Sequence, residues 1–195
     1  MQINNLYLFE IGSAVFSIVY SLLLMFEKKL GWYFGIASSI LGAILFYYTK
    51  IYAQSLISIY YAGVGFYGLW YWNKAEKTNE HIKIWKAINH IYAILILSVV
   101  SYFIAVLFMK YTDSTSPLLD SFITVFGLLA SIKEARKILS SWIYWFVINA
   151  LSVILFYQQG LYYYAVLMVV YALLCIGGYS NWLRIYRKYS NTINN

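Results

Sequence analysis

Charge, proline and cysteine are all scarce in this sequence. Only 11% of its 195 residues are charged, and it contains one proline and one cysteine. A soluble globular domain carries about 25% charged residues, so this chain has too little polar surface to cover a water-soluble globule of its length. The shortage of charge also excludes a disordered chain, and a single cysteine excludes a scaffold of intramolecular disulfides.

Apolar and aromatic side chains make up most of the sequence instead. Hydrophobic residues account for 63% of the chain and aromatic residues for 21%, and the mean hydropathy is +0.67. Such a chain is solvated by lipid, where every backbone polar group needs a partner within the protein and only helices or closed barrels can span. Because the apolar runs are continuous rather than alternating, the sequence predicts an all-α integral membrane protein in a lipid bilayer.

Apolar runs long enough to cross a membrane occur seven times. A helix needs about 20 residues to cross roughly 30 Å of hydrocarbon. The predicted spans cover residues 7–26, 30–49, 51–72, 91–109, 118–132, 140–158 and 161–180. Residues 1–5 contain no lysine or arginine, so they lack the basic start of a cleavable signal peptide and we expect the first span to be retained.

The basic residues fall mostly on one of the two sides that seven crossings define. Twelve of the fourteen follow an odd-numbered span: Lys28, Lys29, Lys74, Lys77, Lys83, Lys86, Lys133, Arg136, Lys137, Arg184, Arg187 and Lys188. Only Lys50 and Lys110 fall on the other side. Because loops rich in lysine and arginine stay in the cytoplasm, we expect the N-terminus outside and the C-terminus in the cytoplasm. The net charge of +7 then reflects topology and not binding to nucleic acid.

Two parts of the sequence match each other at an offset of 110 residues. The run ILFY at residues 44–47 recurs at residues 154–157. Seven further identities keep the same offset: Trp32 with Trp142, Leu41 with Leu151, Tyr52 with Tyr162, Tyr61 with Tyr171, Ala62 with Ala172, Gly68 with Gly178, and Trp72 with Trp182. So many matches exceed what this skewed composition gives by chance, and they indicate an internal repeat.

The repeat pairs the first three spans with the last three, so the predicted fold is a 3+1+3 arrangement. Three crossings reverse the direction of the chain and the fourth span restores it, so the two copies have the same orientation. Parallel repeats of this kind occur in sugar carriers of the SWEET type, and transporters built from repeats bind substrate at the repeat interface near the bilayer midplane. We predict a first three-helix repeat with a cytoplasmic loop over residues 1–90, a linker helix over 91–117, and a second repeat with a cytoplasmic tail over 118–195.

The sequence contains none of the common catalytic or metal-binding motifs. There is no phosphate-binding loop for ATP, no Ser/His/Asp arrangement and no lysine in the middle of a span for a Schiff base. Both histidines, His81 and His90, fall in the predicted cytoplasmic loop without cysteine or acidic residues at metal-binding spacing. We therefore predict no enzymatic activity, no bound metal and no cofactor.

Polar residues within the predicted spans are few, and three residues of the sixth span form one helix face. Trp142, Trp145 and Asn149 are spaced i, i+3 and i+7, which places two aromatic rings and an amide on that face. These side chains can sandwich and orient a flat heterocycle. For Trp142, which begins the span, a place in the interfacial tryptophan belt is the alternative.

Several motifs together resemble the PnuC family of vitamin transporters. The sixth and seventh spans contain the pattern W-x-x-W-x-x-x-N at Trp142, Trp145 and Asn149, and the seventh closes with residues 178–182, GYSNW. The first half contains EKK at 27–29, FG at 34–35, IYA at 51–53 and YG at 67–68. The resemblance covers nearly the whole chain.

This resemblance implies a specific function and a specific site. It implies a transporter in the cytoplasmic (inner) membrane, often a homotrimer, that takes up nicotinamide riboside by facilitated diffusion, with a cytoplasmic kinase trapping the small cationic vitamin. Relatives carry thiamine, which is the alternative substrate. It places Trp142, Trp145 and Asn149 in the substrate site, together with Tyr52, Ser58 and Tyr61 of the third span. Gln54 is the amide nearest to Ser58 in that span and completes the predicted set.

Two other classes of membrane protein remain as remote alternatives. A SWEET-type sugar carrier uses a proline–glutamine pair in each repeat, whereas the single proline here, Pro117, falls in a predicted loop. A receptor that transports nothing is the second alternative. Glu10 and Asp120, which correspond at the offset of 110, lie near the outer ends of their spans, where they can attract a cation, couple protons or stabilise a helix N-terminus.

Overall fold

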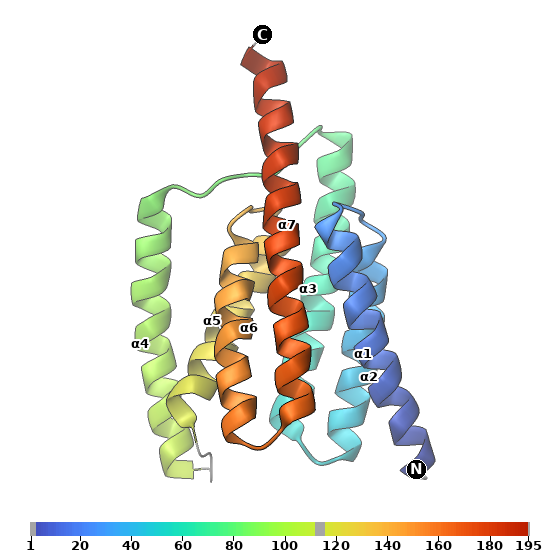
Figure 1. The fold of residues 1–195 in the computed structure, drawn as a ribbon, viewed down its shortest axis with the longest axis vertical. Helices are drawn as coiled ribbons and strands as arrows, with labels where there is room; N and C mark the ends of the chain where they lie inside the picture. Colours follow the sequence, from blue (N-terminus) through green and yellow to red (C-terminus); the bar gives the residue numbers. More distant parts are fainter. Residues whose placement is uncertain (1–2, 112–115, 195) are drawn as a thin grey trace.

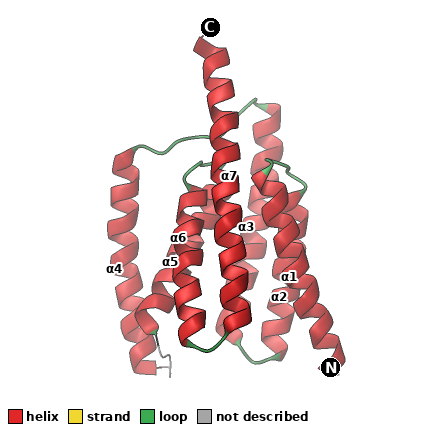
Figure 2. Ribbon diagram, viewed as in Figure 1, coloured by secondary structure: helices red, strands yellow, loops and turns green. Residues whose placement is uncertain are grey.

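Seven α-helices make up the described part of the chain, which covers residues 3–111 and 116–194 of the computed structural model (Figure 1). Figure 2 shows that the described residues between the helices form loops and turns. The helices are α1 (Ile3–Met25), α2 (Gly31–Tyr48), α3 (Tyr52–Lys77), α4 (Ala87–Tyr111), α5 (Pro117–Ala135), α6 (Ser141–Gln158) and α7 (Tyr162–Asn194). Each predicted span corresponds to one helix, so the prediction of an all-α protein is confirmed.

Five of these helices are long and apolar enough to cross a membrane: α1, α2, α4, α6 and α7. The described chain is therefore a multi-pass helical membrane protein. The helices α3 and α5 are not among them, and α5 includes three charged residues, Asp120, Lys133 and Glu134, within its 19 residues. These two helices contact each other, so a neighbouring helix covers part of each surface.

The helices α3 and α5 continue further toward their C-terminal ends than the sequence predicted. The third span ends at residue 72 in the prediction and the fifth at 132, whereas α3 continues to Lys77 and α5 to Ala135. Hydropathy alone misplaces these ends, because a helix can continue past its apolar run where protein covers its polar residues. The extension of α5 places Lys133 and Glu134 inside the protein, at 0% and 3% exposure.

The helix ends separate into two groups at opposite ends of the bundle. The turns after α1, α3 and α5 lie at the end from which the long α7 projects, and we call this the C-terminal end (Figure 1). The turns after α2 and α6 lie at the opposite end, with the N-terminus (Figure 1). The three loops at the C-terminal end are those in which the sequence concentrates lysine and arginine.

The turns at the C-terminal end repeat at the offset of 110. Glu27 follows α1 and Lys137 follows α5, and both have a left-handed backbone, with φ of 55° and 54°. In each turn the next residue donates its N–H five residues back, from Lys28 to Leu23 and from Ile138 to Lys133, both at 2.9 Å. This is the usual way in which a helix satisfies its last carbonyls.

The turns at the opposite end repeat in the same way. Lys50 after α2 and Gly160 after α6 have φ of 63° and 75°. Ile51 donates to Phe46 and Leu161 donates to Phe156, each at 2.8 Å. The four turns thus form two equivalent pairs. Left-handed backbone is unstrained in glycine only, so Lys50 is the less favourable residue for its turn and Gly160 the more favourable one.

Helix packing follows the same correspondence. The contacts of α1 with α2 and of α2 with α3 correspond to those of α5 with α6 and of α6 with α7. Two further contacts, α3 with α5 and α1 with α7, join the halves. These two contacts are equivalent, because α1 corresponds to α5 and α3 corresponds to α7 in the repeat. The helix α4 packs mainly against α5, and its His90 also contacts Tyr144 of α6, with 3.1 Å between Nδ1 and the hydroxyl oxygen.

Four tryptophans form the centre of the protein at its C-terminal end, and we call them the tryptophan core: Trp32, Trp72, Trp142 and Trp182. All are at most 3% exposed. Ring centroids lie 5.7 Å apart for Trp32 and Trp72, 5.5 Å for Trp142 and Trp182, and 5.9 Å for Trp72 and Trp182. Edge-to-face and tilted packing at such distances is favourable between aromatic rings.

Two glycines make room for this core. A Cβ on Gly68 would lie 2.6 Å from the ring of Trp32, and a Cβ on Gly178 would lie 2.5 Å from the ring of Trp142. The other two rings bond across the halves: Trp72 Nε1 donates to the Ala135 carbonyl at 3.1 Å, and Trp182 Nε1 to the Leu24 carbonyl at 2.8 Å. Each half therefore contributes a tryptophan that caps a helix end of the other half.

Ion pairs and a short backbone bridge cover the tryptophan core at the C-terminal end. Lys137 pairs with Glu27 at 2.8 Å, and Lys83 pairs with Glu80 at 2.7 Å. Lys83 also exchanges backbone hydrogen bonds with Lys137 and Leu139, which ties the α3–α4 loop to the α5–α6 turn. The hydrogen bond from Lys83 lowers the pKa of the Glu80 carboxyl, and the same bond raises the pKa of Lys83.

Candidate functional site

A buried carboxylate lies against the sixth helix and accepts hydrogen bonds from two aromatic side chains. Glu134, in the last turn of α5, is 3% exposed. Its Oε2 accepts hydrogen bonds from Trp145 Nε1 of α6 at 3.1 Å and from Tyr20 Oη of α1 at 2.9 Å. Three helices thus meet at one carboxylate oxygen. A buried acidic side chain of this kind needs donors or a cation to offset its desolvation.

The ring of Tyr61 completes this group from α3. Its centroid lies 6.4 Å from that of Trp145, with the planes at 47°. The Tyr61 hydroxyl approaches α5 closely, since a Cβ on Gly127 would lie 2.9 Å from it. We call Tyr20, Tyr61, Glu134 and Trp145 the Glu134 cluster. It joins one side chain from each of four helices and combines aromatic faces with a carboxylate.

The two halves of the protein differ at this cluster. At the offset of 110, Glu134 corresponds to Leu24 and Trp145 corresponds to Gly35. Leu24 is fully buried, and a Cβ on Gly35 would lie 2.6 Å from the ring of Tyr20. The small residue in the first half therefore gives Tyr20 the space from which it reaches Glu134. The cluster is a local departure from the repeat.

Asn149 lies one turn beyond Trp145 on α6 and is buried. Its Nδ2 is 3.6 Å from Cys175 Sγ of α7, a weak hydrogen bond. Cys175 is itself buried and is a free cysteine. A ligand that offers a hydroxyl or carbonyl can replace so weak a partner at little cost. Asn149 is thus a side-chain amide that remains available for recognition.

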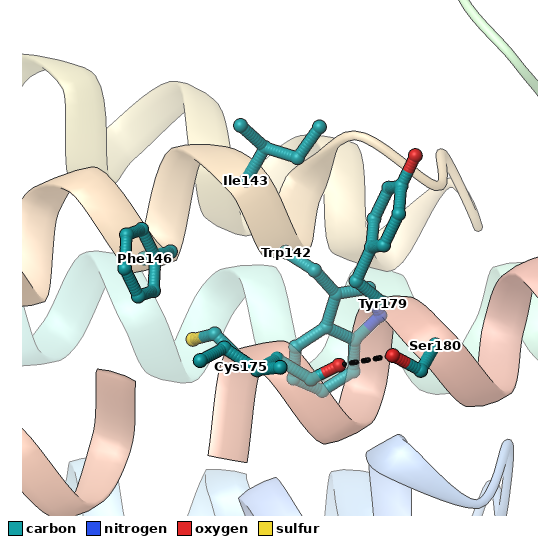
Figure 3. Close-up of a pocket in the computed structure, with 7 residues that line it drawn as sticks. Trp142, Ile143, Phe146, Cys175, Tyr179 and Ser180 are labelled. Atoms are coloured by element: carbon teal, nitrogen blue, oxygen red, sulfur yellow. Dashed lines mark hydrogen bonds between the residues drawn. The ribbon is translucent and has the colours of Figure 1, made fainter. Parts of the chain in front are cut away.

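Trp142 faces a different neighbourhood from Trp145, although both belong to the predicted face of α6. Trp142 belongs to the tryptophan core, where it packs on Gly178 and Trp182. Part of it also borders a groove of about 200 Å³ between α6 and α7 (Figure 3). The groove is lined by Trp142, Ile143, Phe146, Cys175, Ile176, Tyr179 and Ser180, which are mostly apolar. Residues three apart differ by about 60° around a helix, enough to direct two rings to separate neighbours.

The predicted residues of α3 separate along the helix. Tyr61 reaches Trp145, as described above. Ser58 is buried and donates to the Gln54 carbonyl at 2.9 Å, and its hydroxyl faces Gly42 of α2. Tyr52 and Gln54 lie in the first turn of α3 at the far end from Glu134, and both are exposed. The structure therefore brings one of the four α3 candidates to the sixth helix.

A second groove, of about 450 Å³, runs between α3 and α5 and is lined by Tyr60, Gly63, Val64, Tyr67, Ile132 and Arg136. It lies beside the contact of these helices. Tyr60 closes part of it by donating from its hydroxyl to the Leu128 carbonyl at 2.9 Å. Arg136 is its charged lining residue and is exposed.

The remaining ionisable candidates have local partners. Lys133 Nζ lies 3.4 Å from the ring centroid of Tyr144 and 4.4 Å from that of Trp85, so it is directed away from Glu134 toward aromatic faces. Glu10 accepts a long hydrogen bond of 3.4 Å from Tyr164. Asp120 lies in the first turn of α5. Over residues 3–111 and 116–194, no group of His, Cys, Asp and Glu side chains could hold a metal ion.

The sequence reasoning did not identify Glu134 or Tyr20 as candidates. It ended the fifth span at residue 132, which left Glu134 in the loop that follows. The signal that was present is the internal repeat, because an acidic residue at position 134 stands opposite a leucine at position 24.

The multi-pass fold, with polar groups between its helices, is that of a membrane transporter, and comparison with known proteins supports this class. A family model described as "Nicotinamide mononucleotide transporter" matches residues 7–184. The chain belongs to this family of membrane transporters.

Individual relatives and one solved structure agree with that assignment. The nicotinamide riboside transporter PnuC of Escherichia coli is 24% identical over 189 residues, covering 83% of this chain and 79% of its own. The protein of the same name from Neisseria mucosa is 25% identical over 171 residues, covering 80% of this chain and 65% of its own. The crystal structure of "the Vitamin B3 transporter PnuC" superposes with a TM-score of 0.69 at 22% identity, covering 91% of this chain and 81% of that one.

Proposed function

We propose that this protein takes up nicotinamide riboside across the cytoplasmic membrane by facilitated diffusion. The observation that carries the proposal is the approach of Tyr61 to Trp145, with ring centroids 6.4 Å apart, one helix turn from the buried amide of Asn149. Aromatic faces stack on a pyridinium ring, and an amide can bond a carboxamide or a ribose hydroxyl. The names of the two curated relatives agree with this substrate.

The riboside suits this site better than the mononucleotide that the family description names. A phosphate group needs lysine, arginine or backbone N–H donors. The Glu134 cluster contains a carboxylate and no basic side chain, and a phosphate beside it would be repelled. Thiamine is the alternative substrate, since it too is a cationic aromatic heterocycle with a hydroxyl group.

The transport cycle that we propose uses the two halves of the chain. The 3+1+3 arrangement places two parallel three-helix repeats about an axis along the membrane normal, with α4 as the linker. The equivalent turns and the exchanged contacts of α3 with α5 and of α1 with α7 support it. The repeats would rock against each other around the site. Tyr52, Gln54 and Ser58 would line the outer part of the path, and Trp142 would lie on the C-terminal side of Trp145.

The wider biological setting is part of the same proposal. The N-terminus lies outside and the C-terminus in the cytoplasm, so that the basic loops face the cytoplasm. The protein moves its substrate chemically unchanged and uses no cofactor. A cytoplasmic kinase then phosphorylates the vitamin and prevents its return. We also propose a homotrimer, for which the largely exposed apolar surface of α4 offers a contact face.

A binding titration with purified protein tests the substrate. Nicotinamide riboside should bind the wild type, and Trp145→Ala should weaken that binding. Binding of thiamine without the riboside would instead assign the protein to the alternative substrate. If neither vitamin binds, or if Trp145→Ala leaves the affinity intact, the proposed site is wrong.

A further inference from the structure

Glu134 is an acidic side chain that packing alone does not explain. At the corresponding position of the first half, Leu24 occupies a fully buried place beside the tryptophan core. The two backbones have equivalent roles, since each ends its helix in the same kind of turn. A leucine therefore satisfies the packing at this point of the repeat. The second half has a carboxylate there at 3% exposure, where a charge is costly to desolvate.

The hydrogen bonds of Glu134 favour its charged form. Indole N–H groups only donate, so the bond from Trp145 requires Oε2 to be an acceptor. The Tyr20 hydroxyl donates to the same oxygen. Two donors on one oxygen stabilise a carboxylate more than they stabilise a neutral acid. Both bonds end on Oε2, and no hydrogen bond from a described residue ends on Oε1. The second oxygen is therefore left for a ligand.

The protein provides no cation for this carboxylate within the described residues. The ion pairs there join Lys29 to Glu76, Lys83 to Glu80 and Lys137 to Glu27, and none includes Glu134. The adjacent Lys133 has its ammonium group on the rings of Tyr144 and Trp85. A buried carboxylate with donors on one oxygen, aromatic faces beside it and no internal cation matches a positively charged aromatic ligand.

We infer that Glu134 supplies the counter-charge for a cationic heterocycle bound against Trp145, and so makes the site selective for the charged form of its ligand. This inference rests on the proposed function only in taking a vitamin as the ligand. It adds to that function the residue that distinguishes a charged ligand from an uncharged one. Trp145 stacks on the ring, Tyr20 and Trp145 hold the carboxylate in place, and Oε1 faces the positive ring nitrogen. Both candidate vitamins carry such a nitrogen.

A pair of ligands that share their ribose and carboxamide but differ in the charge and the reduction of the ring tests this role. Nicotinamide riboside is a cation, whereas its 1,4-dihydro form has the same ribose and carboxamide and no charge. The wild type should bind the cation more tightly by about tenfold or more, the scale of a charge-assisted contact. Glu134→Gln should remove that preference by weakening the cation at least tenfold, while the dihydro form binds within about twofold of its wild-type affinity.

Control variants separate charge from structure. Glu76→Gln removes an exposed carboxylate that pairs with Lys29, and it should leave both affinities unchanged. Glu134→Asp keeps the charge and should retain part of the preference for the cation. This variant also tests the inference if Glu134→Gln does not fold. Equal weakening of both ligands in Glu134→Gln would show that Glu134 only positions Trp145, and equal affinities in the wild type would show no charge selection. Either result overturns the inference.

The same design distinguishes a wrong vitamin from a wrong residue role. If the wild type binds neither form of the riboside, the titration is repeated with thiamine and its uncharged thiophene isostere. Preference for charged thiamine that Glu134→Gln abolishes would support the role of Glu134 and overturn nicotinamide riboside as the substrate. A wild type that binds neither cationic vitamin would contradict both.

Discussion

Lys137 Nζ lies 2.8 Å from Glu27 Oε1, and the two residues stand 110 positions apart, at equivalent turns of the two halves. The side chains are 10% and 18% exposed, and the lysine also lies 4.8 Å from the ring centroid of Trp72. The pair therefore joins the halves directly over the tryptophan core. It lies at the C-terminal end, between the turns that follow α1 and α5.

Breaking this ion pair should destabilise the protein. Glu27→Gln and Lys137→Gln should each lower the free energy of unfolding by about 1–2 kcal/mol, between the values for exposed and fully buried pairs. Thermal unfolding in detergent measures the change. In a double-mutant cycle the two substitutions should be less than additive. Full additivity would contradict a direct interaction between the two side chains.

The glycines that face the tryptophan core should not tolerate a methyl group. Gly68→Ala and Gly178→Ala would place a Cβ 2.6 and 2.5 Å from an indole ring, so each should cost about 1–3 kcal/mol by overpacking. Gly63→Ala is the matched control on α3, where no described atom lies within 4 Å of the added Cβ. It should be neutral or slightly stabilising, since alanine favours helix. Equal effects at all three positions would argue against this packing.

Removal of the Trp145 ring should weaken substrate binding. Trp145→Ala should lower the affinity for nicotinamide riboside by roughly tenfold to a hundredfold, the range for loss of one aromatic stacking contact. Trp145→Phe keeps a ring but loses the N–H that bonds Glu134, so its affinity should be intermediate. Trp70→Ala, which removes an indole that is 57% exposed on α3, should bind as the wild type does. A titration of the three variants that gave equal affinities would remove Trp145 from the site.

The proposed orientation predicts which introduced cysteines are accessible from outside the cell. Gln159 lies exposed in the α6–α7 turn and Lys28 lies exposed in the α1–α2 turn. A membrane-impermeant thiol reagent should label Gln159→Cys in intact cells, and Lys28→Cys only after permeabilisation. The native Cys175 is buried and should give little background. The reverse labelling pattern would invert the topology.

Much of the fold is predictable because the repeat is present in the sequence. The matches of Trp32 with Trp142, Gly68 with Gly178 and Trp72 with Trp182 become the tryptophan core and the glycines that fit against it. Helix number also follows from the apolar runs. Helix ends were less predictable, because the last turn of α5 depends on tertiary burial of Lys133 and Glu134 rather than on local hydropathy.

The candidate site was predictable only in part, and for the same reason. The spacing of Trp145 and Asn149 correctly placed both on one side of α6, and Tyr61 does reach Trp145. Trp142 packs into the tryptophan core, and Tyr52 and Gln54 lie at the far end of α3. The role of every predicted site residue in binding stays a prediction. Glu134 and Tyr20 meet across 114 positions of the chain, a contact that one sequence cannot reveal.

Flux of nicotinamide riboside into sealed liposomes containing the purified protein is the most direct test of the account. Without ATP or an ion gradient, labelled riboside should enter until the internal and external concentrations are equal. Trp145→Ala and Glu134→Gln should slow this entry at low substrate concentration, and protein-free liposomes should show none. Accumulation above the external concentration would contradict facilitated diffusion. Entry no faster than in protein-free liposomes would contradict transport of this substrate.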